Sequence, residues 1–320
     1  MVHVPDRGVR PAFAAALAAL ATLALAGQAQ AQAPAGGTVP AAQTPSEIRD
    51  YWTPERMRNA VPIGEPFGGG ADDPKRAGRI ASRVKHVRSY PQRTHGKAFL
   101  TMGGLDYVCS GTSVDAPSHS LVWTAGHCVY DPGVAGFGFA TNFLFVPAYR
   151  KGHAPFGKWS MVGIESTQQW KNSNELCVPQ VTVCGDLRFD EGAVTVERKH
   201  GHTLERRVGS RGISFNSDPT QVYRAIGYPA EPPFSGERMF SCTSGMLGRD
   251  DSFDQPKPMK IACDMTGGSS GGGWVTNSGN VASVVSYGYN GAPNRLYGPY
   301  MANAAKGLYA EVKNGTSGRP

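Results

Sequence analysis

Short apolar runs dominate the chain from about residue 97 onward, and turn-forming residues separate them. Clusters of Gly, Pro, Asn, Asp and Ser lie between consecutive runs, as expected where strands are joined by turns. A protein of alternating strands and helices would instead show a helical pattern between its strands. The sequence therefore predicts an all-β sandwich or barrel. The predicted strands cover residues 97–102, 121–124, 143–146, 193–197, 221–227 and 281–289.

One helix is predicted near the C-terminus, where residues 302–312 have helical composition and Gly315 can end the helix. The overall composition agrees with a folded β protein. Hydrophobic residues make up 40% of the 320 positions and charged residues only 18%, which excludes a disordered chain. The 41 glycines and 24 prolines suit many short strands and turns.

The chain carries a formal net charge of +7. A positive charge can attract an anionic partner, but no single stretch has the density of Lys and Arg found in nucleic-acid-binding arms. We interpret the charge mainly as a contribution to solubility, and we expect no nucleic-acid partner.

The N-terminus has the pattern of a secretory signal peptide. Arg7 and Arg10 precede an apolar run over residues 11–26, and two Ala-x-Ala cleavage options follow at residues 29–33. The run is shorter than the roughly 20 residues of a membrane-spanning helix, which makes a retained membrane anchor the weaker alternative. We therefore assign residues 1–33 to a signal peptide. A secreted protein is expected, extracellular or periplasmic, without a membrane partner after cleavage.

Residues 34–88 are predicted to be a propeptide. A spacer rich in Ala, Pro and Gly leads to a Thr-Pro-Ser-Glu capping box at residues 44–47, and a second helix start follows at residues 53–55. Glycines at residues 68–70 then break any helix, and a basic stretch runs over residues 75–93. An ordered N-terminal extension of the mature protein is the alternative interpretation.

The cysteines form an even set, as disulfide bonds require, and export to an oxidising compartment favours such bonds. Zinc binding is the weaker interpretation because the chain has neither a Cys-x-x-Cys pair nor a His-Glu-x-x-His motif. We expect no metal and no cofactor. The six cysteines are Cys109, Cys128, Cys177, Cys184, Cys242 and Cys263, and their spacing alone does not settle their pairing.

A Thr-Ala-Gly-His-Cys motif at residues 124–128 follows an apolar run, and a Cys-Ser-Gly-Thr motif at residues 109–112 precedes it. Together they resemble the histidine signature of the chymotrypsin-like serine peptidases. The resemblance implies an all-β fold of two six-stranded antiparallel β-barrels, here with a C-terminal helix. It also implies a catalytic role for His127 and a disulfide bond between Cys109 and Cys128. The plain alternative is that His127 is an ordinary half-buried histidine.

The segment Thr-Gly-Gly-Ser-Ser-Gly-Gly at residues 266–272 resembles the serine motif of the bacterial glutamyl-endopeptidase-like branch of the same family. A serine hydroxyl needs an adjacent base to become a nucleophile, and small flanking residues let the backbone turn sharply. The motif assigns the nucleophile to Ser270, with Ser269 as the rival. The resemblance also implies an oxyanion hole built from the backbone N–H groups of Gly268 and Ser270.

The third member of a triad should be a carboxylate that lies between His127 and Ser270 in the sequence. Asp190 begins an Asp-x-Gly-Ala-Val run that is similar to the form found in the family. Asp186 and Glu191 are alternatives without that offset. We therefore expect Asp190 to hold the imidazole and to stabilise its cation during the reaction.

The resemblance covers about residues 94–315 and divides the chain into two barrels. We expect the first barrel over residues 89–205, with the histidine and the aspartate. The second barrel is expected over residues 206–320, with the serine, the specificity pocket and the helix. Chain order also predicts two further disulfides, one between Cys177 and Cys184 and one between Cys242 and Cys263.

Departures from the family affect activation and specificity. Ser269 stands where trypsin-like enzymes have the aspartate that pairs with a freed N-terminus, so that ion pair is absent. No histidine follows His202, although glutamyl endopeptidases bind the substrate carboxylate with one, so a preference for Glu is not expected. Asp264 has the offset of the trypsin pocket carboxylate and predicts a preference for Arg or Lys. A small or hydrophobic preference is the alternative.

These features together predict a secreted serine endopeptidase that cleaves polypeptides through a His-Asp-Ser triad and a covalent acyl-enzyme. The substrate backbone is expected to pair with Ser286, Tyr287 and Gly288, the counterpart of a family segment beside the pocket. We expect a monomer. A catalytically silent binding protein on the same fold is the alternative function. An esterase of the Gly-x-Ser-x-Gly type lacks its motif here.

Overall fold

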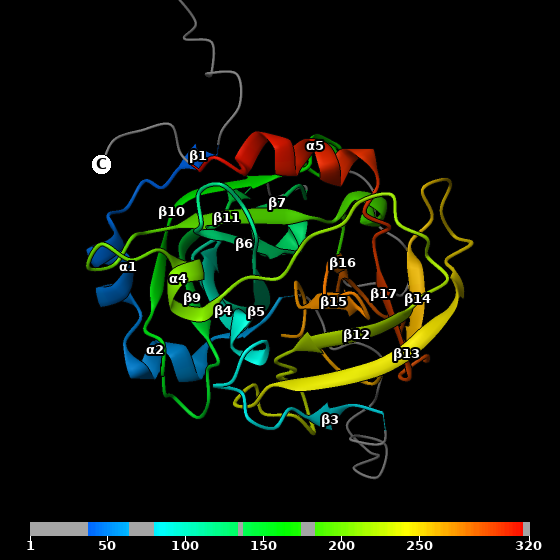
Figure 1. The fold of residues 1–320 in the computed structure, drawn as a ribbon, viewed down its shortest axis with the longest axis horizontal. Helices are drawn as coiled ribbons and strands as arrows, with labels where there is room; N and C mark the ends of the chain where they lie inside the picture. The colour runs from blue at the N-terminus through cyan, green and yellow to red at the C-terminus, as the bar shows by residue number, and fades with distance from the viewer. Residues whose placement is uncertain (1–37, 64–79, 134–136, 174–182, 316–320) are drawn as a thin grey trace, which may run out of the picture. The chain divides into compact units, whose positions relative to one another are not determined.

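The computed structural model describes residues 38–63, 80–133, 137–173 and 183–315. Within these residues most of the regular structure is β-strand, arranged in two large, mainly antiparallel sheets and one small two-stranded sheet (Figure 1). The predicted signal peptide at residues 1–33 lies outside the described residues. In the described part of the chain, no helix is long and apolar enough to cross a membrane.

The first sheet closes into a six-stranded antiparallel barrel. Each strand pairs with the next in the order β4, β5, β6, β11, β10 and β9, and β9 returns to pair with β4. Closure removes the free edges that an open sheet exposes. The strands are β4 (His95–Met102), β5 (Leu105–Val114), β6 (Leu121–Thr124), β9 (Thr141–Pro147), β10 (Trp159–Ser166) and β11 (Gly192–Val196).

A tight hairpin sets the register at the start of this barrel. Gly103 and Gly104 join β4 to β5, and their φ values are 58° and 81°. Two consecutive residues with positive φ give a turn whose twist suits the flanking strands, and glycine adopts them without a steric cost. In the resulting register Ala98 lies opposite Cys109, so the hairpin also positions one half of a disulfide.

The second sheet has six main strands in the order β16, β15, β12, β13, β14 and β17. The segment after β16 meets β17 where Tyr287 bridges to Tyr297, and the sheet forms a half-barrel. The helix predicted at residues 302–312 is α5 (Asn303–Val312). The predicted chymotrypsin-like fold is thus confirmed, with a second barrel less completely closed than the first. The strands are β12 (Val222–Gly227), β13 (Phe240–Arg249), β14 (Met259–Ala262), β15 (Gly273–Thr276), β16 (Val281–Val284) and β17 (Arg295–Gly298).

Fully buried aromatic side chains fill both cores. Trp123 lies in the core of the first sheet and Trp274 in the core of the second. The connections between strands carry short elements. They are η1 (Gln92–Thr94), η2 (Gly126–Cys128), β7 (Tyr130–Asp131), β8 (Gly138–Phe139), α3 (Gln168–Lys171), η3 (Leu187–Phe189) and α4 (Leu204–Val208).

A disulfide within the second sheet agrees with the pairing predicted from chain order. Cys242 in β13 is bonded to Cys263 just after β14, and their Cα atoms are 5.5 Å apart. Cys177 lies outside the described residues, so its bond with Cys184 stays a prediction.

The segment that precedes the first barrel packs against it. Two helices in this segment begin at Thr44 and Thr53, as the sequence predicts, and each Thr side chain accepts a hydrogen bond from the helix backbone. Two short strands extend the first sheet, one antiparallel to β10 and one parallel to β5. The elements are β1 (Val39–Pro40), α1 (Pro45–Tyr51), α2 (Pro54–Asn59) and β2 (Val61–Pro62).

Trp52, between α1 and α2, anchors this segment in the first core. Its side chain is almost fully buried, and Nε1 donates to the carbonyl of Asn142 at 2.6 Å. Farther along, β3 (Ser82–Arg83) pairs with β13 in the second sheet. Residues 38–63 and 80–88 are thus part of the packed fold, whereas the boundary at which a propeptide would end stays a prediction.

Lys97 is a buried cation on β4. Its side chain is 4% exposed, and Nζ lies 3.8 Å from the carboxylate of Glu237. The aromatic rings of Phe99 and Tyr149 lie with their centroids 4.9 Å from Nζ. Burial lowers the pKa of Lys97 from the ordinary value of 10.5 to about 8, although the charge of Glu237 acts in the opposite direction.

Replacing Lys97 by methionine should remove a pH dependence of stability. Because its pKa is lower in the folded protein, the unfolded chain binds more protons between about pH 8 and pH 10.5, and the free energy of unfolding rises with pH in that window. The rise that Lys97 causes amounts to about 3 kcal/mol. Urea denaturation of wild type and Lys97→Met at a series of pH values measures the difference. Equal slopes against pH would contradict the prediction.

Candidate active site

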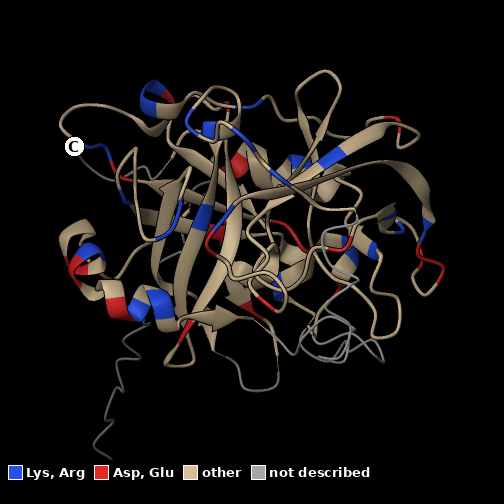
Figure 2. Ribbon diagram, turned by 90° about the horizontal axis from the view of Figure 1, so that it is seen from below, with Lys and Arg blue, Asp and Glu red and all other residues tan. Residues whose placement is uncertain are grey.

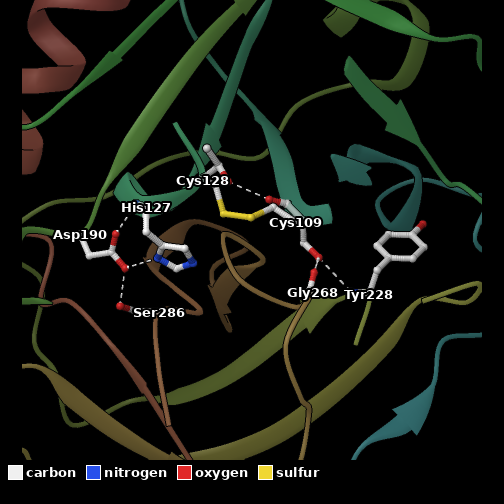
Figure 3. Close-up of a disulfide and its surroundings, with 9 residues drawn as sticks. Cys109, His127, Cys128, Asp190, Tyr228, Gly268 and Ser286 are labelled. Carbon is white, nitrogen blue, oxygen red and sulfur yellow. Dashed lines mark hydrogen bonds and ion pairs between the residues drawn. A yellow bond between two sulfur atoms is a disulfide. The ribbon is translucent and has the colours of Figure 1, made fainter. Parts of the chain in front are cut away.

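His127 lies in η2, directly after β6. The disulfide between Cys109 and Cys128 that the resemblance implies is present and joins this turn to β5, with the Cα atoms 6.3 Å apart (Figure 3). An imidazole nitrogen of His127 and the two sulfur atoms lie within 4.8 Å of one another. The disulfide therefore ties the backbone beside the imidazole to the first barrel.

Asp190, at the end of η3, holds the imidazole through its carboxylate. Oδ2 lies 2.8 Å from Nδ1 of His127, and Oδ1 accepts the backbone N–H of the same residue at 2.8 Å. The hydroxyl of Ser286 donates to Oδ2 at 2.5 Å (Figure 3). A Cβ on Gly126 would lie 2.9 Å from Oδ1, so the glycine of the histidine motif makes room for this carboxylate. Contacts on both oxygens thus fix the fully buried aspartate.

The two alternative acids, Asp186 and Glu191, do not contact the imidazole of His127. Asp186 accepts hydrogen bonds from Nε and Nη2 of Arg188 at 2.8 and 2.7 Å. Burial raises the pKa of Glu191 well above its ordinary value, and the charges of Asp190 and Asp186 act in the same direction. This environment disfavours the charged form of Glu191, which is the form that could support the imidazole. Of the three acids, Asp190 is the one that contacts the imidazole.

The loop that carries Ser270 approaches the histidine motif closely. The N–H of Ser110 donates to the carbonyl of Ser270 at 2.7 Å, and the N–H of Gly271 donates to the carbonyl of Val285 at 2.7 Å. A Cβ on Gly271 would collide with Oγ1 of Thr124, and its φ is 78°, so this position requires glycine. These contacts bring the serine loop against β5, the end of β6 and the segment after β16.

The side chains of Ser270 and His127 are not hydrogen-bonded to each other in the structure. Nε2 of His127 is buried and has no partner among the described residues. The neighbouring Ser269 is engaged elsewhere, because its hydroxyl donates to the carbonyl of Thr266 at 2.6 Å. In unliganded enzymes the hydrogen bonds of catalytic groups are often long and shorten when substrate binds. Nε2 is thus available to accept a proton.

Gly268 and Ser270 offer two backbone N–H groups. Neither N–H has an acceptor within the described part of the chain. Gly268 has a φ of 88°, and a Cβ there would lie 2.8 Å from the carbonyl of Tyr228, so glycine is required. The hydroxyl of Ser110 donates to the Gly268 carbonyl at 2.8 Å and accepts the N–H of Tyr228 at 2.9 Å (Figure 3). These bonds fix the loop whose free N–H groups can stabilise an oxyanion.

The segment 286–288 offers an edge to an extended peptide. Tyr287 pairs with Tyr297 through both its N–H and its carbonyl. The carbonyl of Ser286 and both backbone groups of Gly288 have no partner among the residues that the structure places. A peptide that adds to a sheet edge needs free groups in this alternating pattern. The Tyr287 hydroxyl donates to Asp250 at 2.6 Å and anchors the segment.

Asp264 is 7% exposed and contacts the chain itself. Its Oδ1 accepts the N–H of Ala81 at 2.7 Å, and its Oδ2 accepts the N–H of Ile80 at 3.5 Å. Both oxygens thus have a backbone donor from the segment before β3. The expectation that Asp264 binds a basic substrate side chain stays a prediction, and such a side chain would compete with these two donors.

Among the described residues, the cluster of potential metal ligands is formed by Cys109, His127 and Cys128. The two sulfur atoms are joined in a disulfide and cannot act as thiolate ligands. This cluster therefore does not form a metal site.

Sequence reasoning missed two side chains of the site. It assigns Ser286 only a backbone role, yet the hydroxyl of this residue binds Asp190. It also gives no role to the hydroxyl of Ser110, which connects Gly268 with Tyr228. The one usable signal for Ser110 is its place beside Cys109 in the Cys-Ser-Gly-Thr motif.

Comparison with known proteins places the fold among proteases. The protease Anisep from Arthrobacter nicotinovorans is 39% identical, and the match covers 68% of this chain and 94% of Anisep with a TM-score of 0.61. The thermostable serine protease AL20 from an extremophilic microorganism is 36% identical, with 68% and 97% covered and a TM-score of 0.60. A Glu endopeptidase in complex with MPD, 20% identical, shares the fold over 72% of this chain and 94% of its own, with a TM-score of 0.56.

No family model and no curated protein matches the sequence. The two protease structures nevertheless exceed one third identity and are covered almost completely. Together with the fold and the arrangement around His127, they show that the chain belongs to the chymotrypsin-like serine peptidases.

Proposed function

We propose that this chain is a secreted serine endopeptidase that uses His127, Asp190 and Ser270 as a catalytic triad. The observation that carries the proposal is the pair of contacts between Asp190 and His127, at Nδ1 and at the backbone N–H. A buried carboxylate at Nδ1 favours the tautomer with its proton there. The lone pair is then at Nε2, where it can accept the proton of a serine hydroxyl.

The peptide bond would be cleaved in two steps. Oγ of Ser270 attacks the carbonyl carbon while Nε2 of His127 takes the hydroxyl proton and passes it to the leaving amine, which forms an acyl-enzyme. Water then attacks the ester, His127 again transfers the proton, and the serine is released with a free carboxylate product. The first step requires the Ser270 hydroxyl to come within hydrogen-bond reach of Nε2.

The charge that develops on the carbonyl oxygen would be stabilised by the N–H groups of Gly268 and Ser270. Fixed donors of this kind act without reorganising during the reaction, and loss of one donor costs about 10² to 10³ in kcat. The free backbone groups of Ser286 and Gly288 would hold the substrate as an added strand.

Secretion is part of the same proposal. Disulfides such as Cys109–Cys128 and Cys242–Cys263 are typical of oxidising compartments. They agree with the assignment of residues 1–33 to a signal peptide.

Labelling with a fluorophosphonate tests the proposal on protein taken from the culture medium of secreting cells. The reagent phosphonylates a serine that is activated by a base and flanked by oxyanion donors. We expect one label per wild-type chain, located on Ser270 by mass spectrometry, and none on His127→Ala. A folded wild type that stays unlabelled would favour the silent binding protein. A label on Ser269 would overturn the choice of nucleophile.

A further inference from the structure

A cavity of about 630 Å³ lies outside the candidate active site. One wall is the segment 83–89, which begins in β3 and belongs to the basic stretch of the sequence. The other wall is the connection 148–155 after β9, and Arg238 and Met239 complete the lining. None of the triad or oxyanion residues lines this cavity. Its volume is in the range of sites for small ligands.

The lining is strongly cationic. It contains no Asp or Glu among the described residues, although basic and acidic positions are interspersed over much of the ribbon (Figure 2). His86 and His153 are also lining residues. The cationic side chains are those of Arg83, Lys85, Arg88, Arg150, Lys151 and Arg238.

These six side chains have no partner within the described part of the protein. No hydrogen bond or ion pair involves any of their charged ends, whereas Arg49, Lys171 and Arg188 elsewhere are each paired with a carboxylate. Like charges that share one cavity repel one another unless an anion lies between them. The cavity therefore has an excess of positive charge that its own side chains do not balance.

Glu237 precedes Arg238 in the sequence, but its carboxylate contacts groups other than the six cations. It accepts hydrogen bonds from the Tyr149 hydroxyl at 2.9 and 3.1 Å and lies 3.8 Å from Nζ of Lys97. Its carbonyl accepts the N–H of Lys151. Glu237 thus helps to build the wall without neutralising the cavity.

Backbone contacts hold both walls in place. The N–H of Val84 donates to the carbonyl of Met239 at 2.9 Å, next to the pairing of β3 with β13. His86, Ala148 and Lys151 have φ values of 52°, 52° and 50°, which non-glycine residues rarely adopt. Such conformations persist where the surrounding structure imposes them, and they cluster at binding sites. The cavity is therefore preformed.

We propose that this cavity binds a ligand that carries several phosphate or sulfate groups. Four of the six cations are arginines, whose planar guanidinium groups bind such oxyanions through two parallel hydrogen bonds. A compact cavity with this many cations matches a ligand with several charges close together. Duplex nucleic acid is too large to enter it, and an acidic peptide spreads its single charges along an extended chain.

Isothermal titration of the full secreted protein tests the proposal with three probes at low salt. They are inorganic tripolyphosphate, sucrose octasulfate and the acidic peptide hexa-D-glutamate. We expect one equivalent of tripolyphosphate or of sucrose octasulfate to bind, with an affinity that falls as salt is raised. The probe that binds with the higher affinity shows whether the natural ligand carries phosphate or sulfate groups. Tighter binding of hexa-D-glutamate than of both would overturn the proposal in favour of an acidic peptide.

Pairs of Arg→Gln substitutions test whether the anion binds in this cavity. Arg150→Gln with Arg238→Gln should weaken binding of the preferred anion by about 100-fold, since each lost charged hydrogen bond costs about tenfold or more. Arg206→Gln with Lys306→Gln, on exposed residues outside the cavity, removes the same charge and should change the affinity less than about twofold. Arg83→Gln with Arg88→Gln, on the opposite wall, repeats the test independently. Equal weakening by the control pair, or no binding of either anion, would refute the site.

Discussion

Ser270→Ala is expected to lower kcat on a peptide substrate by about 10⁶-fold. The substitution removes the atom that would form the bond to the acyl carbon, and KM should change little because the free backbone groups of Ser286 and Gly288 are untouched. The hydroxyl of Ser270 makes no hydrogen bond to the described residues, so its loss leaves no partner unsatisfied. The free energy of unfolding should therefore change by less than about 0.5 kcal/mol. Steady-state kinetics with a fluorogenic peptide and urea denaturation measure the two effects.

Ser269→Ala is the matched control, because it removes the same atom from the adjacent residue. The Ser269 hydroxyl donates to the carbonyl of Thr266, which also accepts the Ser269 N–H at 3.2 Å and so keeps one donor. We expect kcat/KM to fall by no more than about tenfold, the value of one modest hydrogen bond. If Ser269→Ala abolished turnover and Ser270→Ala did not, the nucleophile would have been assigned to the wrong serine.

The parts of the site that could be predicted are those whose constraints lie within short motifs. Gly126 stands directly before His127 because a side chain there would press on the carboxylate of Asp190. Gly268 and Gly271 have positive φ and lie close to neighbouring backbone or side chains. Each of these steric requirements appears in the sequence as a glycine at a fixed distance from a reactive residue. A short sequence motif can therefore reveal it.

Contacts between residues far apart in the chain could not be predicted in this way. The hydroxyl of Ser286 reaches Asp190 across 96 positions, and the indole of Trp52 reaches the carbonyl of Asn142 across 90 positions. Neither Ser286 nor Trp52 lies in a sequence motif that indicates which residue it contacts. Trp52 also lies in a segment predicted to be a propeptide. Its burial depends on the shape of a barrel whose strands come later in the chain.

The choice of the triad acid also depends partly on a local motif and partly on tertiary contacts. Asp186, Asp190 and Glu191 lie within six positions, and the offset of the Gly-Ala-Val run favours Asp190 without showing what each carboxylate contacts. The fold separates them, because one pairs with Arg188, one is buried with a raised pKa, and one contacts the imidazole. The environment of each group, which tertiary packing creates, decides its chemistry.

Asp190→Asn is expected to lower kcat by about 10⁴-fold, as the same exchange does in other triads. The backbone N–H of His127 needs an acceptor at Oδ1, so the asparagine oxygen takes that place and its NH₂ group faces Nδ1. Nδ1 must then accept a hydrogen bond, and the ring proton moves to Nε2. An imidazole in this tautomer cannot take the proton of Ser270. Kinetics on the fluorogenic peptide measure the loss, and urea denaturation reports whether the fold is retained.

Glu191→Gln provides the control for this exchange, since it makes the same chemical change at the neighbouring buried residue. Burial already raises the pKa of Glu191 well above its ordinary value, so the amide replaces a carboxyl group whose charged form is already disfavoured. We expect kcat to stay within about tenfold of wild type, because no bond to the imidazole is lost. A large loss in Glu191→Gln together with near-normal turnover in Asp190→Asn would transfer the third triad position to Glu191. It would also mean that Asp190 only orients His127 through Nδ1, while another acid stabilises the charged imidazole.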